Sequence, residues 1–152
     1  MNALKLLKKD HSAVKNLFSK FDKTGRSSHE TRGELFEQIR RELQIHLRAE
    51  EELFYPAIKA LTGQELRNLF SEALKEHKQI DELLTQISRL KPNDRNFEEK
   101  VETLFENVEH HVEEEEGEIF QFAEKNCSDN ELEDLGRQIE ERKKALDRQL
   151  AA

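Results

Sequence analysis

The chain has 152 residues, 38% of them charged and 35% hydrophobic, and carries a formal net charge of -8 at pH 7. This length fits one domain, and five glycines and two prolines are too few for the many tight turns of an all-β fold, so helices are expected to dominate. An acidic surface repels phosphate groups, which argues against a nucleic-acid partner.

Five segments of the chain show apolar residues spaced alternately three and four apart, the pattern typical of amphipathic α-helices. They cover about residues 4–21, 35–57, 66–87, 97–122 and 132–150. Pro92 makes the break between the third and fourth segments the firmest boundary. Ser128 with Glu131, and Thr62 with Glu65, have the spacing of a capping box that begins a helix.

Four long helices joined by short connections predict an all-α fold, an antiparallel up-down four-helix bundle. This bundle is expected within residues 1–125. The weaker fifth pattern, within residues 128–152, predicts an accessory helix packed on the same domain, outside the bundle or beside a second subunit.

Each of the four bundle helices carries one histidine on its apolar stripe, and two of these histidines have a glutamate four residues later. A polar side chain on a core-facing stripe loses its hydration, which costs roughly 2–7 kcal/mol when no partner replaces the water. A bound metal is the natural partner. We therefore predict a metal site made of His11, His46, Glu50, His77, His111 and Glu115.

The pattern occurs twice along the chain. When His11 is superimposed on His77, the apolar positions of their helices coincide, and residues 46–51 of the following helix align with 111–116. Two helical hairpins, each with one histidine and one His-x-x-x-Glu motif, would build a site with approximate twofold symmetry.

Residues four apart in a helix share a face, so each His-x-x-x-Glu motif presents an imidazole and a carboxylate to one point. Six donors are more than one tetrahedral zinc uses, and there is no cysteine cluster, so two metals fit better. If the glutamates bridge, each metal receives two imidazoles and two carboxylate oxygens, with room for an exogenous oxygen ligand. This donor set suits iron or manganese, and redox chemistry favours iron.

The doubled motif, with the sequences HLRAEEELFYP and HVEEEEGEIF, resembles the hemerythrin-like HHE cation-binding domain over about residues 4–122. This resemblance implies a non-haem di-iron centre in a four-helix bundle, with the six residues above as ligands and with carboxylate and oxo or hydroxo bridges. Manganese or zinc are possible substitutes.

The sequence departs from the oxygen-carrying hemerythrins of invertebrates, which have a His-x-x-x-His pair on the third helix. The residues four away from His77 are Ala73 and Asp81, and Glu115 lies four rather than five residues after His111. The pattern resembles bacterial HHE proteins instead, which weakens the case for reversible oxygen carriage.

Several polar residues near the motifs are assigned other roles. His29 and His110 are expected to face solvent, and the run Glu113 to Glu116 is expected to be a solvated face except at Glu115. Asp81 is considered as an additional ligand or a partner for His77.

Two further side chains are judged by their place relative to the ligand stripe. Tyr55 is rotated away from this stripe, so no redox role is expected for it. Ala73 is the smallest residue flanking the ligands and could leave a cavity that admits a diatomic molecule.

Location is inferred from what the sequence lacks. No stretch approaches the roughly 20 apolar residues of a membrane span, and the N-terminal segment has no secretory apolar run. A single cysteine, Cys127, agrees with a reducing compartment. We expect a cytoplasmic protein with no membrane partner, as a monomer or homodimer.

The leading hypothesis is a di-iron protein that binds or reacts with O2, NO or peroxide. One alternative is an iron storage, sensing or delivery protein without turnover. Another is an oxygen-activating enzyme acting on an organic substrate. The residues leave open whether the protein is an enzyme, and a peroxide- or NO-consuming activity is one possibility.

Overall fold

The computed structural model describes residues 1–151, and every regular element in that range is helical. The elements are α1 (Ala3–Asp22), α2 (His29–Ala49), η1 (Glu50–Phe54), α3 (Tyr55–Thr62), α4 (Arg67–Ser88), α5 (Arg95–Glu114), η2 (Glu115–Ile119), α6 (Phe120–Asn126) and α7 (Asp129–Ala151). The two η elements are π-helical turns within otherwise α-helical rods, α2–η1–α3 and α5–η2–α6.

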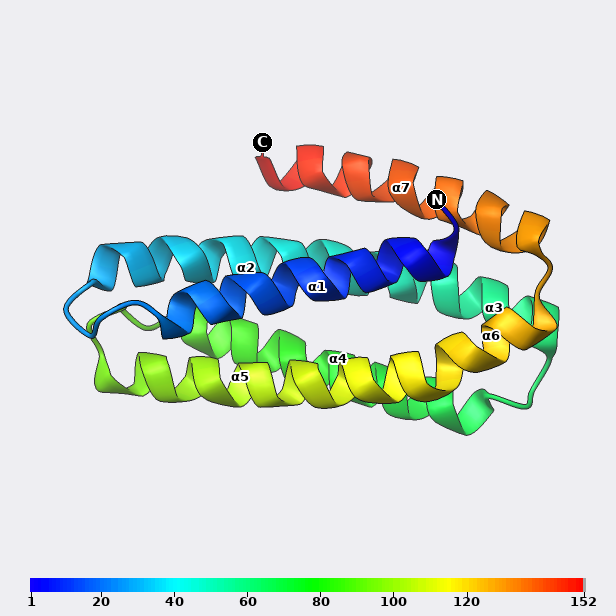
Figure 1. Cartoon of the computed structure of the whole chain (residues 1–152). Coiled ribbons are helices and arrows are strands. Elements are labelled where there is room, and N and C mark those ends of the chain that lie inside the picture. The colour runs from blue at the N-terminus through cyan, green and yellow to red at the C-terminus, as the bar shows by residue number, and fades with distance from the viewer. Residues whose placement is uncertain (152) are drawn as a thin grey trace.

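The rods assemble as two hairpins. Helix α1 packs on α2, and α4 packs on α5, with further contact between α2 and α4. The four rods run alternately up and down, as Figure 1 shows. The predicted all-α four-helix bundle with an additional C-terminal helix is therefore confirmed.

Helix α7 lies outside the bundle along the α1–α2 hairpin, drawn from orange to red in Figure 1. It contacts α1, α2 and η1. Arg142 and Lys143 of α7 form ion pairs with Glu52 and Asp10 respectively, so the helix is held by charge as well as by its buried apolar face.

The core consists of two apolar clusters separated by a polar layer. One cluster contains Leu7, Phe54, Phe70 and Phe120, and the other contains Phe18, Ile39, Leu84 and Leu104. Full burial of each such side chain stabilises the fold by about 1.5–3 kcal/mol. On α1, α4 and the α5–η2–α6 rod, the predicted metal-binding residues lie between the segments that contribute to the two clusters. On the α2–η1–α3 rod, His46 and Glu50 lie where one segment passes into the other.

One of the two predicted capping boxes is present. The backbone N–H of Ser128 donates to Glu131 Oε1 at 2.8 Å, and the N–H of Glu131 donates to Ser128 Oγ at 3.1 Å. The prediction at Thr62 is wrong, because α3 continues through Thr62, whose hydroxyl donates back to the Ile58 carbonyl. Helix α4 then begins at Arg67.

Crossing a bilayer requires a helix that is both long and apolar. Within residues 1–151, none combines the length and the hydropathy needed to cross a bilayer.

Candidate metal centre

The structure brings the six predicted metal-binding side chains together in the middle of the bundle. None is more than 8% exposed. We call this group the central cluster: His11 of α1, His46 of α2, Glu50 of η1, His77 of α4, His111 of α5 and Glu115 of η2.

The central cluster contains two groups of four donors, and both glutamates belong to both groups. His11 and His46 form one group with the glutamates, and His77 and His111 form the other. Within each group the donor atoms lie within 4.8 Å of one another. The two Nε2 atoms are 3.1 Å apart in each histidine pair, so the halves match.

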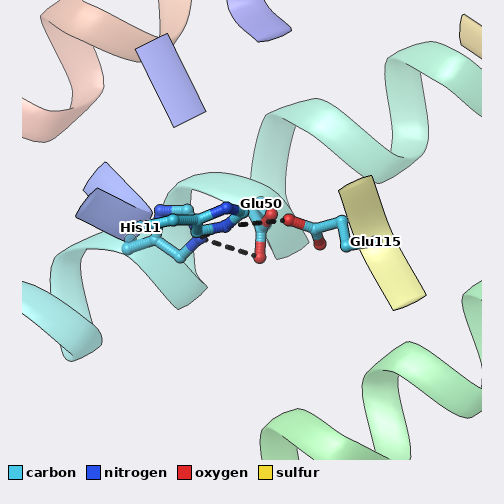
Figure 2. Close-up of side chains that lie close together, drawn as sticks. His11, Glu50 and Glu115 are labelled. Atoms are coloured by element: carbon cyan, nitrogen blue, oxygen red, sulfur yellow. Dashed lines mark hydrogen bonds and ion pairs between the residues drawn. The ribbon is translucent and has the colours of Figure 1, made fainter. Parts of the chain in front are cut away.

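The glutamates lie between the histidine pairs. Glu50 Oε1 is 3.3 Å from His46 Nε2 and 3.1 Å from His77 Nε2. Glu115 reaches the pairs with different oxygens, Oε1 at 3.2 Å from His11 Nε2 and Oε2 at 3.3 Å from His111 Nε2. Figure 2 shows His11, Glu50 and Glu115 pointing toward one another. Two cations held by the two pairs would thus share both carboxylates.

Each of the two glutamates also has one oxygen without a hydrogen-bond partner. Glu50 Oε2 and Glu115 Oε1 are shielded from solvent and accept no hydrogen bond from the described residues. Leaving a buried acceptor without a hydrogen-bond partner costs the folded state about 1–3 kcal/mol, and more when the acceptor is charged. Metal cations coordinated by these oxygens would remove that penalty, so the residues present fit a metal site.

Each histidine of the central cluster is oriented by a second carboxylate at its other ring nitrogen, Nδ1. The Nδ1–carboxylate pairs are His46 with Asp10 at 2.9 Å, His111 with Glu76 at 2.9 Å, His77 with Glu51 at 2.8 Å and His11 with Glu116 at 2.6 Å. An Nδ1–H that donates to a carboxylate leaves Nε2 free to bind a metal. All four imidazoles are thereby aimed inward.

These four carboxylates occupy equivalent places in the two halves. Asp10 and Glu76 each precede a histidine of the central cluster, whereas Glu51 and Glu116 each follow one of its glutamates. Sequence reasoning missed them, although the repeated acidic neighbour was a usable signal. The expectation that Glu116 belongs to a solvated face is wrong.

Asp81 does not orient His77. It forms an ion pair with Arg48 at 3.3 Å, while Glu51 occupies the Nδ1 side of His77. The other two histidines behave as expected, since His29 is exposed and the side chain of His110 is 69% exposed.

Tyr55 points into the central cluster, so the expectation that it faces away is wrong. Its hydroxyl donates to Glu115 and lies 3.3 Å from His77 Nε2. Five residues of regular α-helix would leave Tyr55 about 140° away from Glu50. The π-helical turn reduces this offset, because the Tyr55 N–H bonds to the Glu50 carbonyl five residues earlier.

The second hairpin has the same turn with a different side chain. The Phe120 N–H bonds to the Glu115 carbonyl, and the Phe120 ring stacks on His11 with centroids 5.8 Å apart and planes at 6°. The tyrosine hydroxyl therefore lies in only one half of the central cluster.

The electrostatics of the central cluster favour positive charge. Burial works to lower the pKa of His46, but Glu50 and Asp10 outweigh it and raise this pKa to about 10. Burial works to raise the pKa of Glu50, yet His46 and the neighbouring polar groups hold it well below its ordinary value. Burial, reinforced by the charges of Glu115 and Glu50, raises the pKa of Tyr55 well above its ordinary value, so its hydroxyl keeps its proton.

Two small cavities touch the central cluster. One, of about 10 Å³, is lined by His11, His46, Val14, Leu43, Leu47, Ile80, Val108, His111 and Val112. The other has a similar volume and is lined by Leu69, Ala73, Glu76, His111, Glu114, Glu115 and Ile119. Ala73 thus does border a cavity, and each space has room for about one water-sized molecule.

A helical bundle that buries four imidazoles around two shared carboxylates is a candidate cation-binding bundle. The comparison with family models gives the same class: the hemerythrin HHE cation binding domain matches residues 2–123. The chain belongs to this family.

Relatives of known sequence or structure agree. The crystal structure of a hemerythrin HHE cation binding domain-containing protein from Mycobacterium kansasii, a homologue of Rv2633c, superimposes with a TM-score of 0.82 at 30% identity, covering 97% of this chain and 88% of that one. The uncharacterized protein Rv2633c of Mycobacterium tuberculosis is 31% identical over 137 residues, 90% of this chain and 81% of its own length.

A third relative is larger. A protein of Nostoc sp. named DNA nickase is 27% identical over 151 residues, which are 99% of this chain. The chain spans 41% of that relative's length.

Proposed function

We propose that this chain is a non-haem di-iron protein that binds or reacts with O2, NO or peroxide. His11, His46, Glu50, His77, His111 and Glu115 would hold the two irons, and Glu50 and Glu115 would be shared between them. The observation that carries the proposal is the pair of four-donor groups that share Glu50 and Glu115. Bound iron would supply electrons and a coordination position for a small oxidant or for NO.

The surrounding residues have separate tasks. The four outer carboxylates hold the imidazoles in the orientation that binds metal. The two apolar clusters keep bulk water away. Tyr55 holds a proton at its hydroxyl oxygen beside Glu50, Glu115 and His77, where it can donate a hydrogen bond to a small ligand.

The two alternative functions, iron handling and oxidation of an organic substrate, need different amounts of space beside the metal site. Storage, sensing or delivery of iron uses the same ligands and needs no substrate space. An organic substrate needs more room than the two cavities of about 10 Å³ that touch the central cluster. A larger hollow of about 250 Å³ lies at the surface against His11 and Glu116. Among the six proposed ligands that hollow touches His11 alone, so the cavities support a diatomic molecule or peroxide better than an organic substrate.

The proposal is tested by metal content per chain together with absorption spectra of the reduced protein before and after exposure to O2, NO or peroxide. We expect two irons and new charge-transfer bands. His46→Ala and Glu115→Ala should lose stoichiometric iron and keep their helical content. Glu113→Ala is the matched control, because Glu113 is exposed.

The outcomes separate the alternatives. Two irons retained in His46→Ala or Glu115→Ala would contradict the ligand set. Iron that exchanges readily, with no consumption of peroxide or NO, would favour storage or delivery. Manganese or zinc in place of iron would leave the ligands standing and change the chemistry.

The remaining expectations belong to the same proposal. We infer that residues 1–125 are the metal-binding unit and that the C-terminal segment, expected at 128–152, is an accessory helix of the same domain, supported by the contact of Lys143 with Asp10. Ala152 lies outside the described residues. A cytoplasmic location and a monomeric or homodimeric state stay predictions.

The name of the Nostoc relative raises DNA as a possible substrate. The net charge of -8 disfavours phosphate binding, so we infer no action on DNA for this chain. Incubation of the iron-loaded protein with supercoiled plasmid tests this, and nicked product above a metal-only control would overturn it.

A further inference from the structure

A second group of potential metal ligands lies at the surface between α4 and α5. We call it the surface cluster: Glu76 of α4 with His110 and Glu114 of α5. Its three donor atoms lie within 4.8 Å of one another. His110 Nε2 is 3.5 Å from Glu76 Oε2 and 3.2 Å from Glu114 Oε2. One imidazole with two carboxylates is a donor set that binds divalent transition metals.

The surface cluster is open on one side and closed on the other. The His110 side chain is 69% exposed, whereas the Glu76 side chain is 11% exposed. Glu76 uses Oε1 to hold His111 Nδ1 at 2.9 Å, so its Oε2 faces His110. A cation arriving from solvent would therefore meet His110 first and a largely buried carboxylate behind it.

The two carboxylates of the surface cluster are held close together. Glu76 Oε2 and Glu114 Oε2 each lie within 3.5 Å of His110 Nε2, and like charges held so close repel each other. Glu114 Oε2 is shielded from solvent, and its contact with His110 lacks the geometry of a hydrogen bond, so this oxygen has no hydrogen-bond partner in the described part of the chain. A divalent cation between the carboxylates would relieve the repulsion and occupy this oxygen.

A small cavity borders residues of both the surface cluster and the central cluster. Its volume is about 10 Å³, and Glu76 and Glu114 line it together with His111 and Glu115. Ala73 contributes only a methyl group to its wall. The cavity therefore reaches from ligands of the surface cluster to ligands of the central cluster.

The other half of the bundle has no such cluster. The repeat places Asp10 at the position of Glu76, but Ile45 and Ala49 stand where His110 and Glu114 stand. Lys143 of α7 also forms an ion pair with Asp10. The surface cluster is thus a feature of one hairpin and does not follow from the twofold repeat.

We propose that Glu76, His110 and Glu114 form a third, solvent-facing cation site, through which Fe²⁺ enters the central cluster. The evidence for the cation site comes from the geometry of these three residues and does not depend on the proposed di-iron function. The site's role in loading rests on the proposed di-iron function.

The binding test uses iron-loaded protein and Mn²⁺ as the probe, measured by calorimetry and by the electron paramagnetic resonance signal of free Mn²⁺. We expect one additional Mn²⁺ per chain, bound about tenfold or more weakly in His110→Ala and in Glu114→Gln. Glu113→Gln, a change at an exposed neighbour, should bind like the wild type. Equal Mn²⁺ binding by wild type and His110→Ala would overturn the site.

The loading test mixes apo protein with Fe²⁺ without oxygen and follows iron uptake in time. We expect uptake to be slowed about tenfold in His110→Ala, while two irons are still bound at the end. An unchanged rate in a variant that has lost the Mn²⁺ site would overturn the entry role. A chain that binds Mn²⁺ at the surface but no iron in the central cluster would contradict the proposed function and leave the surface site standing.

Discussion

Tyr55 and Phe120 occupy equivalent positions of the two hairpins, yet only Tyr55 brings a hydroxyl to the central cluster. Each residue follows a π-helical turn and donates its N–H to the carbonyl of a predicted ligand, Glu50 or Glu115. The Tyr55 hydroxyl lies among Glu50, Glu115 and His77, whereas Phe120 stacks on His11. The two halves of the central cluster therefore differ in that only one has a hydroxyl group that could donate a proton to a bound ligand.

Removing this hydroxyl should affect reactivity more than metal content. Tyr55→Phe keeps the ring, and we expect two irons per chain with altered absorption bands. The single-turnover rate with peroxide should fall by about a hundredfold or more, since a positioned proton donor is lost. Stopped-flow spectroscopy checks this. The same bands and rates as in the wild type would show that the hydroxyl takes no part.

The outer carboxylates should tune metal affinity. Glu116→Gln replaces a charged acceptor of the His11 Nδ1–H with a neutral one, so we expect iron affinity to fall about 10- to 100-fold. Competition with a chelator of known affinity measures the change. Glu113→Gln removes the same charge from an exposed position and serves as the control. Equal losses in both variants would indicate a general charge effect.

The docking of α7 depends on Gly136. A Cβ at this position would overlap the Met1 carbonyl oxygen and lie 3.0 Å from the Ala3 nitrogen. We expect Gly136→Ala to lower the free energy of unfolding by about 1–3 kcal/mol, because the N-terminus and α7 must separate. Thermal unfolding should shift downward by about 2–4 °C for each kcal/mol.

Gly117→Ala is the control for this substitution, since its Cβ would meet no atom within 4 Å. We expect that variant to be as stable as the wild type or slightly more stable. A Gly136→Ala variant with unchanged unfolding would show that the contact between α7 and the N-terminus relaxes without cost.

Cys127 should react slowly with alkylating reagents. Burial, followed by the charge of Glu131, raises the pKa of the Cys127 thiol above its ordinary value. A raised thiol pKa leaves less thiolate at any given pH, so alkylation should become appreciable at a higher pH than for a free cysteine. Mass spectrometry of iodoacetamide labelling between about pH 7 and 10 tests this, with unfolded protein as the reference. Equal pH profiles for folded and unfolded protein would refute it.

The helices and the members of the central cluster could be predicted from local sequence patterns. The 3.6-residue period identified the four rods, and the four-residue spacing of His46 with Glu50, and of His111 with Glu115, placed each pair on one face. These patterns depend on one helix at a time, which is why they can be read along the chain. The same period indicated the C-terminal helix.

The contacts between rods could not be obtained in this way. Glu116 meets His11 across more than a hundred residues, and whether an acidic residue on a helix faces solvent or a neighbouring imidazole depends on how the rods pack. Asp81 illustrates the same limit, because its spacing from His77 suits a partner but packing gives it Arg48.

Tyr55 shows the strongest effect of the folded backbone. Regular helix geometry turns it away from Glu50, and the π-helical turn rotates it back toward the predicted ligands. That turn depends on i→i+5 backbone hydrogen bonds, which residue periodicity does not reveal. Side-chain chemistry and spacing thus specify the donors of this site, while helix packing and one backbone register shift specify which groups surround them.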